Sequence, residues 1–355
     1  MKKLLYITSI TSPYKVKFFN ELQEKCELTV IYEVSTTKNR DKKWLISTEK
    51  KHREIIMAEN DNESPVKIGY KILKYVLKNY GNFDEIILGC CNSRAEMMVY
   101  IAMMFKGIKF SMNIEGETFF NDHGIKLILK KLFIKGASKF YVAGEKALES
   151  TKKMIGKANA PYIPYYFSSL TDKEIKENTK KSRVRKEFIL VVAQYEYCKG
   201  LDIVLDIAKS MPERRFKFVG MNAKTEQFKK LVDEKQVDNV EIISFMTSKE
   251  LENQYLSCKC LVLPSRRECW GLVINEAASY GTPIISTYGS GAAVEFLENE
   301  YSELLAEPDN VSSLKNILKC FLDKDDLYIK KYSEYLINKN FNYSIEKMVL
   351  THAKD

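Results

Sequence analysis

The sequence has few residues of the kinds that build metal sites and disulfide frameworks. Its 355 residues include only three histidines, and none of them has the spacing of metal ligands. None of the eight cysteines forms a CxxC pair, and four of them lie in or beside apolar runs, where free cysteine behaves as a small hydrophobe. We therefore expect no zinc site, and the cysteines indicate a reducing compartment.

Long apolar runs are also missing. No stretch reaches the roughly 18 apolar residues that a membrane-spanning helix needs. The N-terminal MKKLLYITSITSPY is basic and then apolar, but the apolar part is short and interrupted by Thr and Ser. It favours a first β-strand over a signal peptide. We expect a cytoplasmic protein, either soluble or peripheral at the inner face of the membrane.

Glycine is absent from the first strand and the loop after it, LLYITSITSPYKV, which excludes the dinucleotide-binding fingerprint of a dehydrogenase. Charge of one sign is not concentrated either, although 56 basic and 47 acidic residues give a net charge of +9. Dispersed lysine argues against a nucleic-acid partner, which clustered arginine and aromatics would recognise. The excess fits a phosphorylated substrate or an acidic membrane surface, or simply a solvated lysine-rich surface.

What is present is a regular alternation of short apolar runs with longer helical patterns, which predicts an α/β fold with parallel sheets covered on both faces. The expected strands of the first half are 4–8, 28–32, 54–57, 85–88, 109–114 and 139–142, and the expected helices are 66–80, 92–106 and 125–135. The polar stretch 168–187 reads as a linker or a solvated helix. After it the alternation restarts with FILVVA, RFKFVG, VEIIS, CLVLP and TPIIS.

We therefore predict two doubly wound domains. The predicted boundaries are 1–167 for the first domain, 168–186 for the linker, 187–338 for the second domain and 339–355 for a terminal helix. In open α/β sheets ligands bind outside the carboxyl ends of the strands, so two such domains facing each other would form a binding cleft.

One such strand end lies in CLVLPSRRECWGLVINEAASYG. The strand ends at Pro264, and a loop leads into a helix expected from about Gly271 to Tyr280. The first amides of this helix form a ready anion site, which Glu268 and Glu276 flank without occupying. Carboxylates accept hydrogen bonds from hydroxyls, so the arrangement suits a nucleotide sugar. The alternative is that Glu268 is merely exposed and Glu276 caps or pairs on its helix.

The same stretch resembles a known family. Two glutamates separated by seven residues, after LVLPS and before GTPIIS, resemble the signature of the family-four glycosyltransferases, and the match continues through GSGAAVEFL with Gly291 and Glu295. The resemblance implies a retaining, nucleotide-sugar-dependent hexosyltransferase of polysaccharide biosynthesis. It also implies the GT-B fold, which has two facing Rossmann-like domains and a C-terminal helix that crosses back to the first. The resemblance covers nearly the whole chain and is strongest from 188 to 297.

The resemblance also implies roles for individual residues. Lys199 contacts the donor diphosphate, while Gln194 stands where the family often has arginine. Glu268 orients the sugar hydroxyls, and Glu276 holds the ribose. The predicted donor-binding residues are Gln194, Lys199, Phe245, Met246, Glu268, Trp270, Gly271, Leu272 and Glu276. For Phe245 and Met246, contact with the base and packing in the core are equally compatible with the sequence.

On the acceptor side the sequence departs from the family. Ser12, Pro13 and Tyr14 replace a glycine pair, and MNIEGETFF carries Asn113, Glu115 and Glu117 where many relatives place a histidine. We predict Ser12, Pro13, Tyr14 and Glu115 as acceptor-side residues, and Glu268, Lys199 and Glu115 as catalytic residues. The expected partners are a nucleotide-sugar donor, a glycan or lipid-linked acceptor and a membrane surface.

We expect neither a cofactor nor a metal ion. The diphosphate charge would be met by Lys199 and the helix amides. Asp323 and Asp325 form a DxD motif, but it lies between two helical segments and predicts a solvated turn. The alternative function that remains open is a nucleotide-sugar epimerase of the same two-domain fold.

Overall fold

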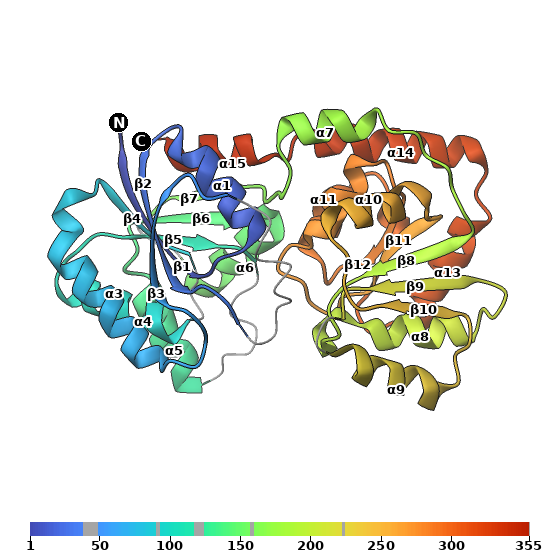
Figure 1. Ribbon diagram of the computed structural model, residues 1–355, viewed down its shortest axis with the longest axis horizontal. Helices are drawn as coiled ribbons and strands as arrows, with labels where there is room; N and C mark the ends of the chain where they lie inside the picture. Colours follow the sequence, from blue (N-terminus) through green and yellow to red (C-terminus); the bar gives the residue numbers. More distant parts are fainter. Residues whose placement is uncertain (38–48, 90–92, 117–123, 157–159, 222–223, 355) are drawn as a thin grey trace. The chain divides into compact units, whose positions relative to one another are not determined.

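The computed structural model describes residues 1–355 apart from 38–48, 90–92, 117–123, 157–159, 222–223 and 355. The chain divides into two compact units. Unit 1 consists of Met1–Ser169 and Ile345–Asp355, and unit 2 is Leu170–Ser344. Each unit contains one parallel β-sheet with helices on both faces (Figure 1).

The sheet of unit 1 has seven strands in the order β3-β2-β1-β4-β5-β6-β7. The strands are β1 (Lys3–Ile10), β2 (Glu27–Val34), β3 (Arg53–Ala58), β4 (Glu85–Leu88), β5 (Ser111–Ile114), β6 (Lys139–Ala143) and β7 (Tyr162–Tyr165). Every pair is parallel, and in the centre Tyr6 of β1 lies between Val30 and Ile87. The central strands are buried on both faces, which explains their continuous apolar sequences.

Helices cover both faces of this sheet. They are α1 (Pro13–Gln23), α3 (Pro65–Asn79), α4 (Arg94–Phe105), α5 (Gly124–Ile134), α6 (Gly144–Ile155) and α15 (Ile345–Ala353). The helices α3, α4 and α5 lie side by side on one face, and α1 and α15 pack together on the other (Figure 1). In α3 the buried positions Ile68, Ile72 and Val76 recur every four residues, which is the spacing of one helix face.

Unit 2 repeats the arrangement with six strands in the order β10-β9-β8-β11-β12-β13. The strands are β8 (Phe188–Val192), β9 (Arg215–Val219), β10 (Val240–Ile243), β11 (Cys260–Leu263), β12 (Ile284–Thr287) and β13 (Leu305–Ala306). The helices are α7 (Asp172–Thr179), α8 (Leu201–Lys209), α9 (Thr225–Lys235), α10 (Ser248–Ser257), α11 (Leu272–Ser279), α12 (Gly291–Leu297), α13 (Val311–Leu322) and α14 (Asp326–Asn340).

The structure confirms the six strands expected in the first half and adds β7, which sequence analysis missed. β7 is a short, partly exposed edge strand with proline at position 164, so it lacks the buried apolar run of the others. The polar stretch after it contains α7, which begins with a capping box between Thr171 and Glu174. Residues 170–186, predicted as a linker, lie in unit 2.

The terminal helix is α15, and it packs in unit 1 against α1 and β7, as predicted. Each sheet also has a point where the strand order reverses. In unit 1 this point lies between β1 and β4, and in unit 2 between β8 and β11. Loops that leave neighbouring strands in opposite directions open a crevice there, so these two strand pairs mark where ligands are expected.

Candidate active site

The two loops at the strand reversal of unit 2 are in direct contact. The loop after β8 contains Gly200, whose backbone is left-handed with φ of 68°. A Cβ at this position would collide with the carbonyl oxygen of Pro264, the residue after β11. The Arg267 amide donates a hydrogen bond to the Cys198 carbonyl at 3.0 Å. Glycine after Lys199 therefore allows the two loops to pack backbone against backbone.

This packing brings the predicted lysine and glutamate together. Lys199 and Glu268 form an ion pair, and their side chains are 22% and 16% exposed, so the pair is partly open to solvent. A Cβ on Gly271 would lie 3.3 Å from the Cγ of Glu268, which places this carboxylate beside the start of α11. Lysine, glutamate and helix N-terminus thus form one site in unit 2.

Gly271 is the N-cap residue of α11 and has a φ of 102°, which favours glycine. A side chain here would also approach the Oγ of Ser290 at 2.9 Å. The Glu268 amide donates to the Gly289 carbonyl at 2.8 Å, and the Ala292 amide donates to the Trp270 carbonyl at 2.8 Å. The loop after β12 and the start of α12 (Gly291–Leu297) therefore fix the loop that carries Glu268.

Glu276 lies in the middle of α11 and is half-buried. The hydroxyl of Tyr255, on α10, donates a hydrogen bond to its Oε2 at 2.9 Å. Burial and the charge of Glu276 raise the pKa of Tyr255 well above its usual value, so the phenol keeps its proton. Each carboxylate oxygen has two lone pairs, so Glu276 can bind a ligand hydroxyl in addition to the partners it has in the protein.

The other predicted donor-binding residues differ in what their side chains contact. Trp270 is 3% exposed, and its indole nitrogen donates to the Asn275 Oδ1 at 2.8 Å. The indole is therefore used in the packing of unit 2, and the backbone carbonyl of Trp270 accepts hydrogen bonds from the Ala292 amide and the Ser290 hydroxyl. Gln194 is half-buried at the end of β8, and its carbonyl accepts from the Glu196 amide at 2.9 Å.

The remaining three predicted donor-binding residues, Phe245, Met246 and Leu272, are half-buried. Phe245 and Met246 lie in the loop between β10 and α10. A capping box between Thr247 and Glu250 fixes the start of α10. Neither side chain is fully buried, so the loop retains apolar surface at the carboxyl edge of the sheet. Leu272 is the first residue of α11.

Sequence analysis missed Arg266, which holds the loop in place. Its guanidinium donates two hydrogen bonds to the carboxylate of Asp202 at 2.8 and 2.7 Å and also pairs with Asp309. It lies 4.1 Å from the ring centroid of Tyr197, in the loop after β8. Hydrogen bonds to Asp202 raise the pKa of the guanidinium, so it stays charged. An arginine two residues before Glu268 was the available signal, but its partners Asp202 and Asp309 lie far away in the sequence.

The predicted acceptor-side residues lie in unit 1, where β1 ends. Ser12 is 1% exposed and is the N-cap of α1, although its side chain makes no capping hydrogen bond. Among the described residues, the buried hydroxyls of Thr11 and Ser12 have no hydrogen-bond partner. Pro13 and Tyr14 begin the helix and are half-buried. Buried hydroxyls without a partner are rare in proteins, so the start of α1 is a place where a water molecule or a ligand group is expected.

Lys15 is a second residue that sequence analysis missed. It is 7% exposed, and its ammonium contacts the Glu115 carboxylate at 3.0 Å and the Thr8 hydroxyl at 3.0 Å. This ion pair fixes Glu115, whose side chain is 24% exposed, beside the end of β1. Lys15, Glu115, Tyr14 and Asn113 line a small pocket in unit 1. Glu117 lies outside the described residues.

The DxD motif is a turn, as predicted. Asp323 ends α13, and Asp325 is the N-cap of α14, where its carboxylate accepts from the Tyr328 amide at 2.7 Å. Both residues are exposed. The helix cap accounts for Asp325 at this position.

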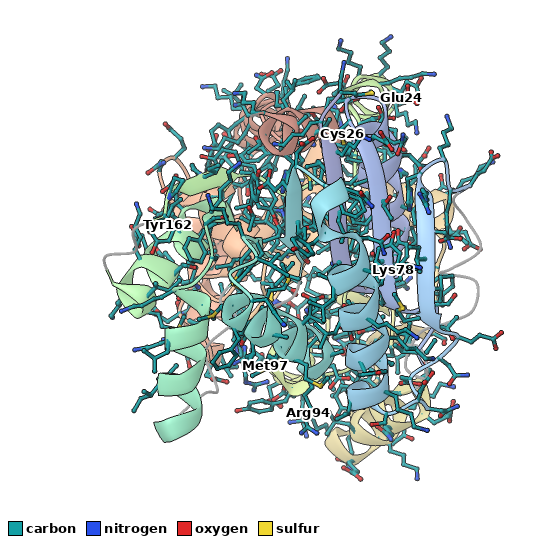
Figure 2. The ribbon with its side chains drawn as sticks, turned by 90° about the vertical axis from the view of Figure 1, so that its left-hand side faces the viewer. Glu24, Cys26, Lys78, Arg94, Met97 and Tyr162 are labelled. Carbon is teal, nitrogen blue, oxygen red and sulfur yellow. The ribbon has the colours of Figure 1, made fainter. Side chains whose placement is uncertain are left out.

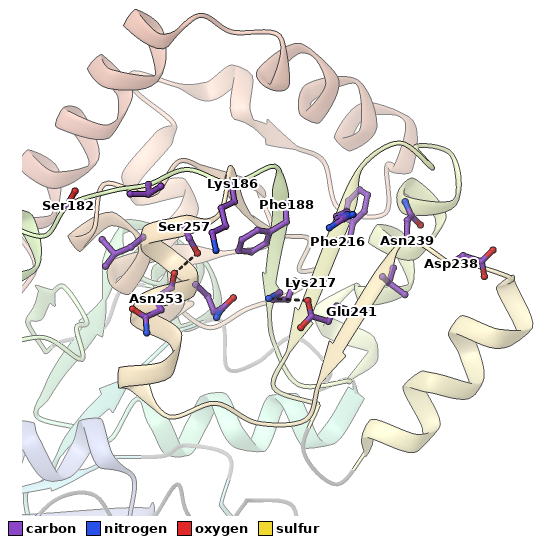
Figure 3. A pocket seen from close by; sticks show the side chains of 15 residues that line it. Ser182, Lys186, Phe188, Phe216, Lys217, Asp238, Asn239, Glu241, Asn253 and Ser257 are labelled. Atoms are coloured by element: carbon purple, nitrogen blue, oxygen red, sulfur yellow. Dashed lines mark hydrogen bonds and ion pairs between the residues drawn. The ribbon is translucent and has the colours of Figure 1, made fainter.

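Unit 2 also has a cavity of about 740 Å³ that does not coincide with the predicted site (Figure 3). It lies at the amino ends of β8, β9 and β10 and beside α10, with Phe188, Phe216, Lys217 and Asn253 among its lining residues. Lys217 pairs there with Glu241 at 3.1 Å. Lys199 and Glu268 lie at the opposite, carboxyl edge of the same sheet, where the strand order reverses.

Comparison with known proteins gives a family match for most of unit 2. Residues 172–341 match the family model described as "Glycosyl transferases group 1", so the donor-side loops and α11 fall within the matched segment. An uncharacterized glycosyltransferase of Haemophilus influenzae is 26% identical over 175 residues, which are 48% of this chain and 49% of that protein. An uncharacterized glycosyltransferase of Methanocaldococcus jannaschii is 28% identical over 140 residues, 39% of each chain.

An uncharacterized 41.2 kDa protein in the cps region of Klebsiella pneumoniae is 30% identical over 129 residues, 35% of each chain. The match thus spans half or less of the length of each of these relatives. Sequence similarity to them covers only part of this chain.

Solved structures match almost the whole chain. A sucrose-phosphate synthase from Thermosynechococcus elongatus covers 99% of this chain and 97% of its own, with a TM-score of 0.77 and 14% identity. The Anabaena protein HepE in complex with UDP covers 99% of this chain and 98% of its own, with a TM-score of 0.69 and 13% identity. At this level of identity the likeness shows the fold, which is the GT-B type with two Rossmann-like units.

Proposed function

We propose that this chain, whose residues 172–341 match the family model of the group 1 glycosyl transferases, transfers a sugar from a nucleotide-sugar donor. The acceptor is a growing surface glycan or a lipid-linked glycan, and the configuration at the anomeric carbon is retained. The observation that carries the proposal is the Lys199–Glu268 pair beside Gly271, at the strand reversal of unit 2.

The chemistry of this site suits a sugar diphosphate. Lys199 supplies a mobile positive charge, and the amides at the start of α11 supply hydrogen-bond donors. Both stabilise the negative charge that develops on a departing nucleoside diphosphate. Glu268 then accepts hydrogen bonds from the sugar, and Glu276 from the ribose. Because Lys199 and the helix amides meet the diphosphate charge, the proposed reaction uses neither a metal ion nor a cofactor.

We propose further that the nucleotide of the donor is uridine diphosphate. Solved structures with the same fold include the Anabaena protein HepE with UDP-glucose and a trehalose-6-phosphate protein from E. coli bound with UDP-2-fluoro glucose. Phe245 and Met246 offer apolar surface at the carboxyl edge of the sheet, which a base can contact. For retention, we propose that the acceptor attacks from the face that the leaving diphosphate vacates.

The acceptor side rests on unit 1. The Glu115 carboxylate, held by Lys15, and the unsatisfied hydroxyls of Thr11 and Ser12 are hydrogen-bonding groups for a glycan hydroxyl. The relative from the cps region of Klebsiella pneumoniae supports a surface polysaccharide as the product. We propose that the chain works in the cytoplasm at the inner face of the membrane, where lipid-linked glycans are extended. The epimerase alternative gains no support from the group 1 match.

The direct test is a screen of nucleotide sugars by thermal shift, because ligand binding to the folded state raises the melting temperature by mass action. UDP-linked sugars should stabilise the wild-type chain, and Lys199→Ala should remove most of the shift. Radiolabelled sugar from the stabilising donor should then appear in a lipid or glycan fraction. If no nucleoside diphosphate sugar stabilises the chain, the proposed function is wrong.

A further inference from the structure

Unit 1 carries a concentration of exposed apolar side chains on one of its two helical layers. Val66, Tyr70 and Leu77 of α3 are 62%, 63% and 39% exposed, and Phe105, the last residue of α4, is 85% exposed. Ile128 and Leu132 of α5 are each 57% exposed. Side chains of this size are normally scattered singly over a soluble surface, so their gathering on three neighbouring helices needs an explanation.

On α3 these side chains form a regular stripe. Val66, Tyr70 and Leu77 lie along one line of the helix, which the half-buried Leu73, itself packed partly against the core, completes at intervals of four, three and four residues. Each is followed by a lysine, so Lys67, Lys71, Lys74 and Lys78 form a second line beside the first. All four lysines are exposed. The core-facing side of α3 is a third, separate line, formed by Ile68, Ile72 and Val76.

Figure 2 shows this helical layer facing the viewer, with Lys78, Arg94 and Met97 on it. The layer has a strong charge imbalance. Residues 64–82, 97–114 and 124–144 contain no Asp or Glu, and Glu96 of α4 is fully buried. Lys71 pairs with Glu63 at 2.8 Å. Within the described part of the chain, the structure gives no partner for Lys67, Lys74 or Lys78.

We infer that the outer surface of α3, α4 and α5 docks onto an anionic lipid bilayer. An exposed apolar line next to a line of lysines is the pattern of a helix that lies in a membrane interface. The apolar side chains enter the boundary between headgroups and acyl chains, and the lysines bind acidic headgroups. Among the residues that the structure describes, no helix is both long and apolar enough to cross a bilayer. This inference rests on the proposed function, which includes a lipid-linked acceptor at the membrane, and it names the surface by which the chain would bind that membrane.

The test uses the full chain and vesicles made from equal parts of phosphatidylcholine and phosphatidylglycerol. Binding is measured by co-sedimentation, with pure phosphatidylcholine vesicles alongside. The wild-type chain should bind the anionic vesicles, and added salt should weaken the binding. The triple variant Lys67→Gln, Lys74→Gln and Lys78→Gln should lower the partition coefficient by about fivefold for each lysine, on the order of a hundredfold in total.

A second triple variant in unit 2 is the matched control. Lys230→Gln, Lys249→Gln and Lys330→Gln removes the same charge from exposed positions of α9, α10 and α14. It should bind the vesicles nearly as well as the wild type. Phe105→Ser tests the apolar contribution and should weaken binding at unchanged charge, without unfolding the chain because the ring is exposed.

Three outcomes would overturn the inference. They are no binding of the wild-type chain to anionic vesicles, equal loss in the two triple variants, and self-association of the free chain that Phe105→Ser abolishes. The last outcome would assign the surface to a second copy of this chain. The shift in melting temperature with UDP is measured on the same samples. If UDP raises the melting temperature but the chain does not bind vesicles, only the docking surface is refuted. If the chain binds vesicles but UDP does not raise the melting temperature, only the donor site is refuted.

Discussion

Lys199 and Glu268, 69 residues apart in the sequence, form an ion pair between the loop after β8 and the loop after β11. Among the described residues, neither side chain has a second ion-pair partner. In this state the lysine is neutralised by a protein carboxylate. A bound diphosphate would compete with Glu268 for the same ammonium, and this competition leads to two distinguishable predictions.

Removal of the lysine should weaken donor binding. We expect Lys199→Ala to lower the affinity for UDP by about 10- to 100-fold, because a hydrogen bond to a charged group contributes about 1.5–3 kcal/mol. Isothermal titration calorimetry with UDP measures the effect. Lys229→Ala on α9 removes an exposed lysine that pairs with Glu226, and this variant is the control that should leave the affinity unchanged. Equal affinities for wild type and Lys199→Ala would exclude this lysine from the diphosphate site.

Neutralising the glutamate should separate binding from transfer. In Glu268→Gln the competing carboxylate is gone, so Lys199 is free and UDP should bind as tightly as in the wild type or more tightly. Transfer should fall by at least about a hundredfold, because the sugar is no longer held in the reactive orientation. The measurements are the Kd for UDP and kcat with the donor that the screen identifies. A variant that loses UDP binding and keeps kcat would reverse the assigned roles.

The glycine at the start of α11 should tolerate no side chain. Gly271→Ala would place a Cβ 2.9 Å from the Ser290 Oγ and 3.3 Å from the Glu268 Cγ, at a backbone φ of 102°. We expect a loss of about 1–3 kcal/mol in the free energy of unfolding and weaker UDP binding. Urea denaturation measures the first effect. Gly81→Ala, whose Cβ would meet nothing within 4 Å, is the control and should leave stability nearly unchanged.

Transfer should not depend on a divalent metal ion. Lys199 and the amides of α11 meet the diphosphate charge in our proposal, and Asp325 of the DxD motif caps α14. Activity assayed with excess EDTA should therefore equal activity with magnesium. A loss of activity in EDTA that Mg²⁺ or Mn²⁺ restores would show that the diphosphate needs a cation that the protein does not supply.

The stability of unit 1 should fall as the pH drops from about 6.5 towards 4. Burial lowers the pKa of His352, which stacks on Tyr141 with ring centroids 4.4 Å apart, to about 4. In the unfolded chain His352 has a pKa near 6.5, so it binds a proton there before the folded protein does. The contribution of neutral His352 to the free energy of unfolding is therefore fully present above about pH 6.5. It is lost as the pH falls from there towards the pKa of the folded state, about 4. At about 1.4 kcal/mol per pH unit, the proton on His352 alone accounts for a loss that approaches roughly 3 kcal/mol. His52, whose pKa burial also lowers to about 4, adds a second loss of the same sign in unit 1.

Urea denaturation at a series of pH values measures this loss. His352→Gln removes the titrating group, and its unfolding free energy should vary less with pH over the same range, even if it is lower throughout. The comparison is made within each protein, so a general loss of stability in the variant does not obscure the result. Identical pH profiles for the two proteins would show that His352 does not control the acid sensitivity.

The sequence by itself determined the elements and their class. Continuous apolar runs such as the one before Pro264 have to be buried on both faces, which demands parallel strands covered by helices. The loop after β11 and the helix after it could also be predicted from the sequence. Proline ends a strand, and Gly271 starts a helix at a backbone angle that favours glycine. These are local constraints, and they fix the position of Glu268 relative to α11.

Only the tertiary structure decided which distant residues meet. Arg266 binds Asp202, Lys15 binds Glu115, and His352 of the last helix packs among aromatic rings of unit 1. Trp270 proved to be a buried packing residue through its bond to Asn275. The paired lines of lysine and apolar residues on α3 are visible in the sequence. Whether such a line faces the core or solvent depends on which side of the helix the sheet covers, and that is set by packing between elements far apart along the chain.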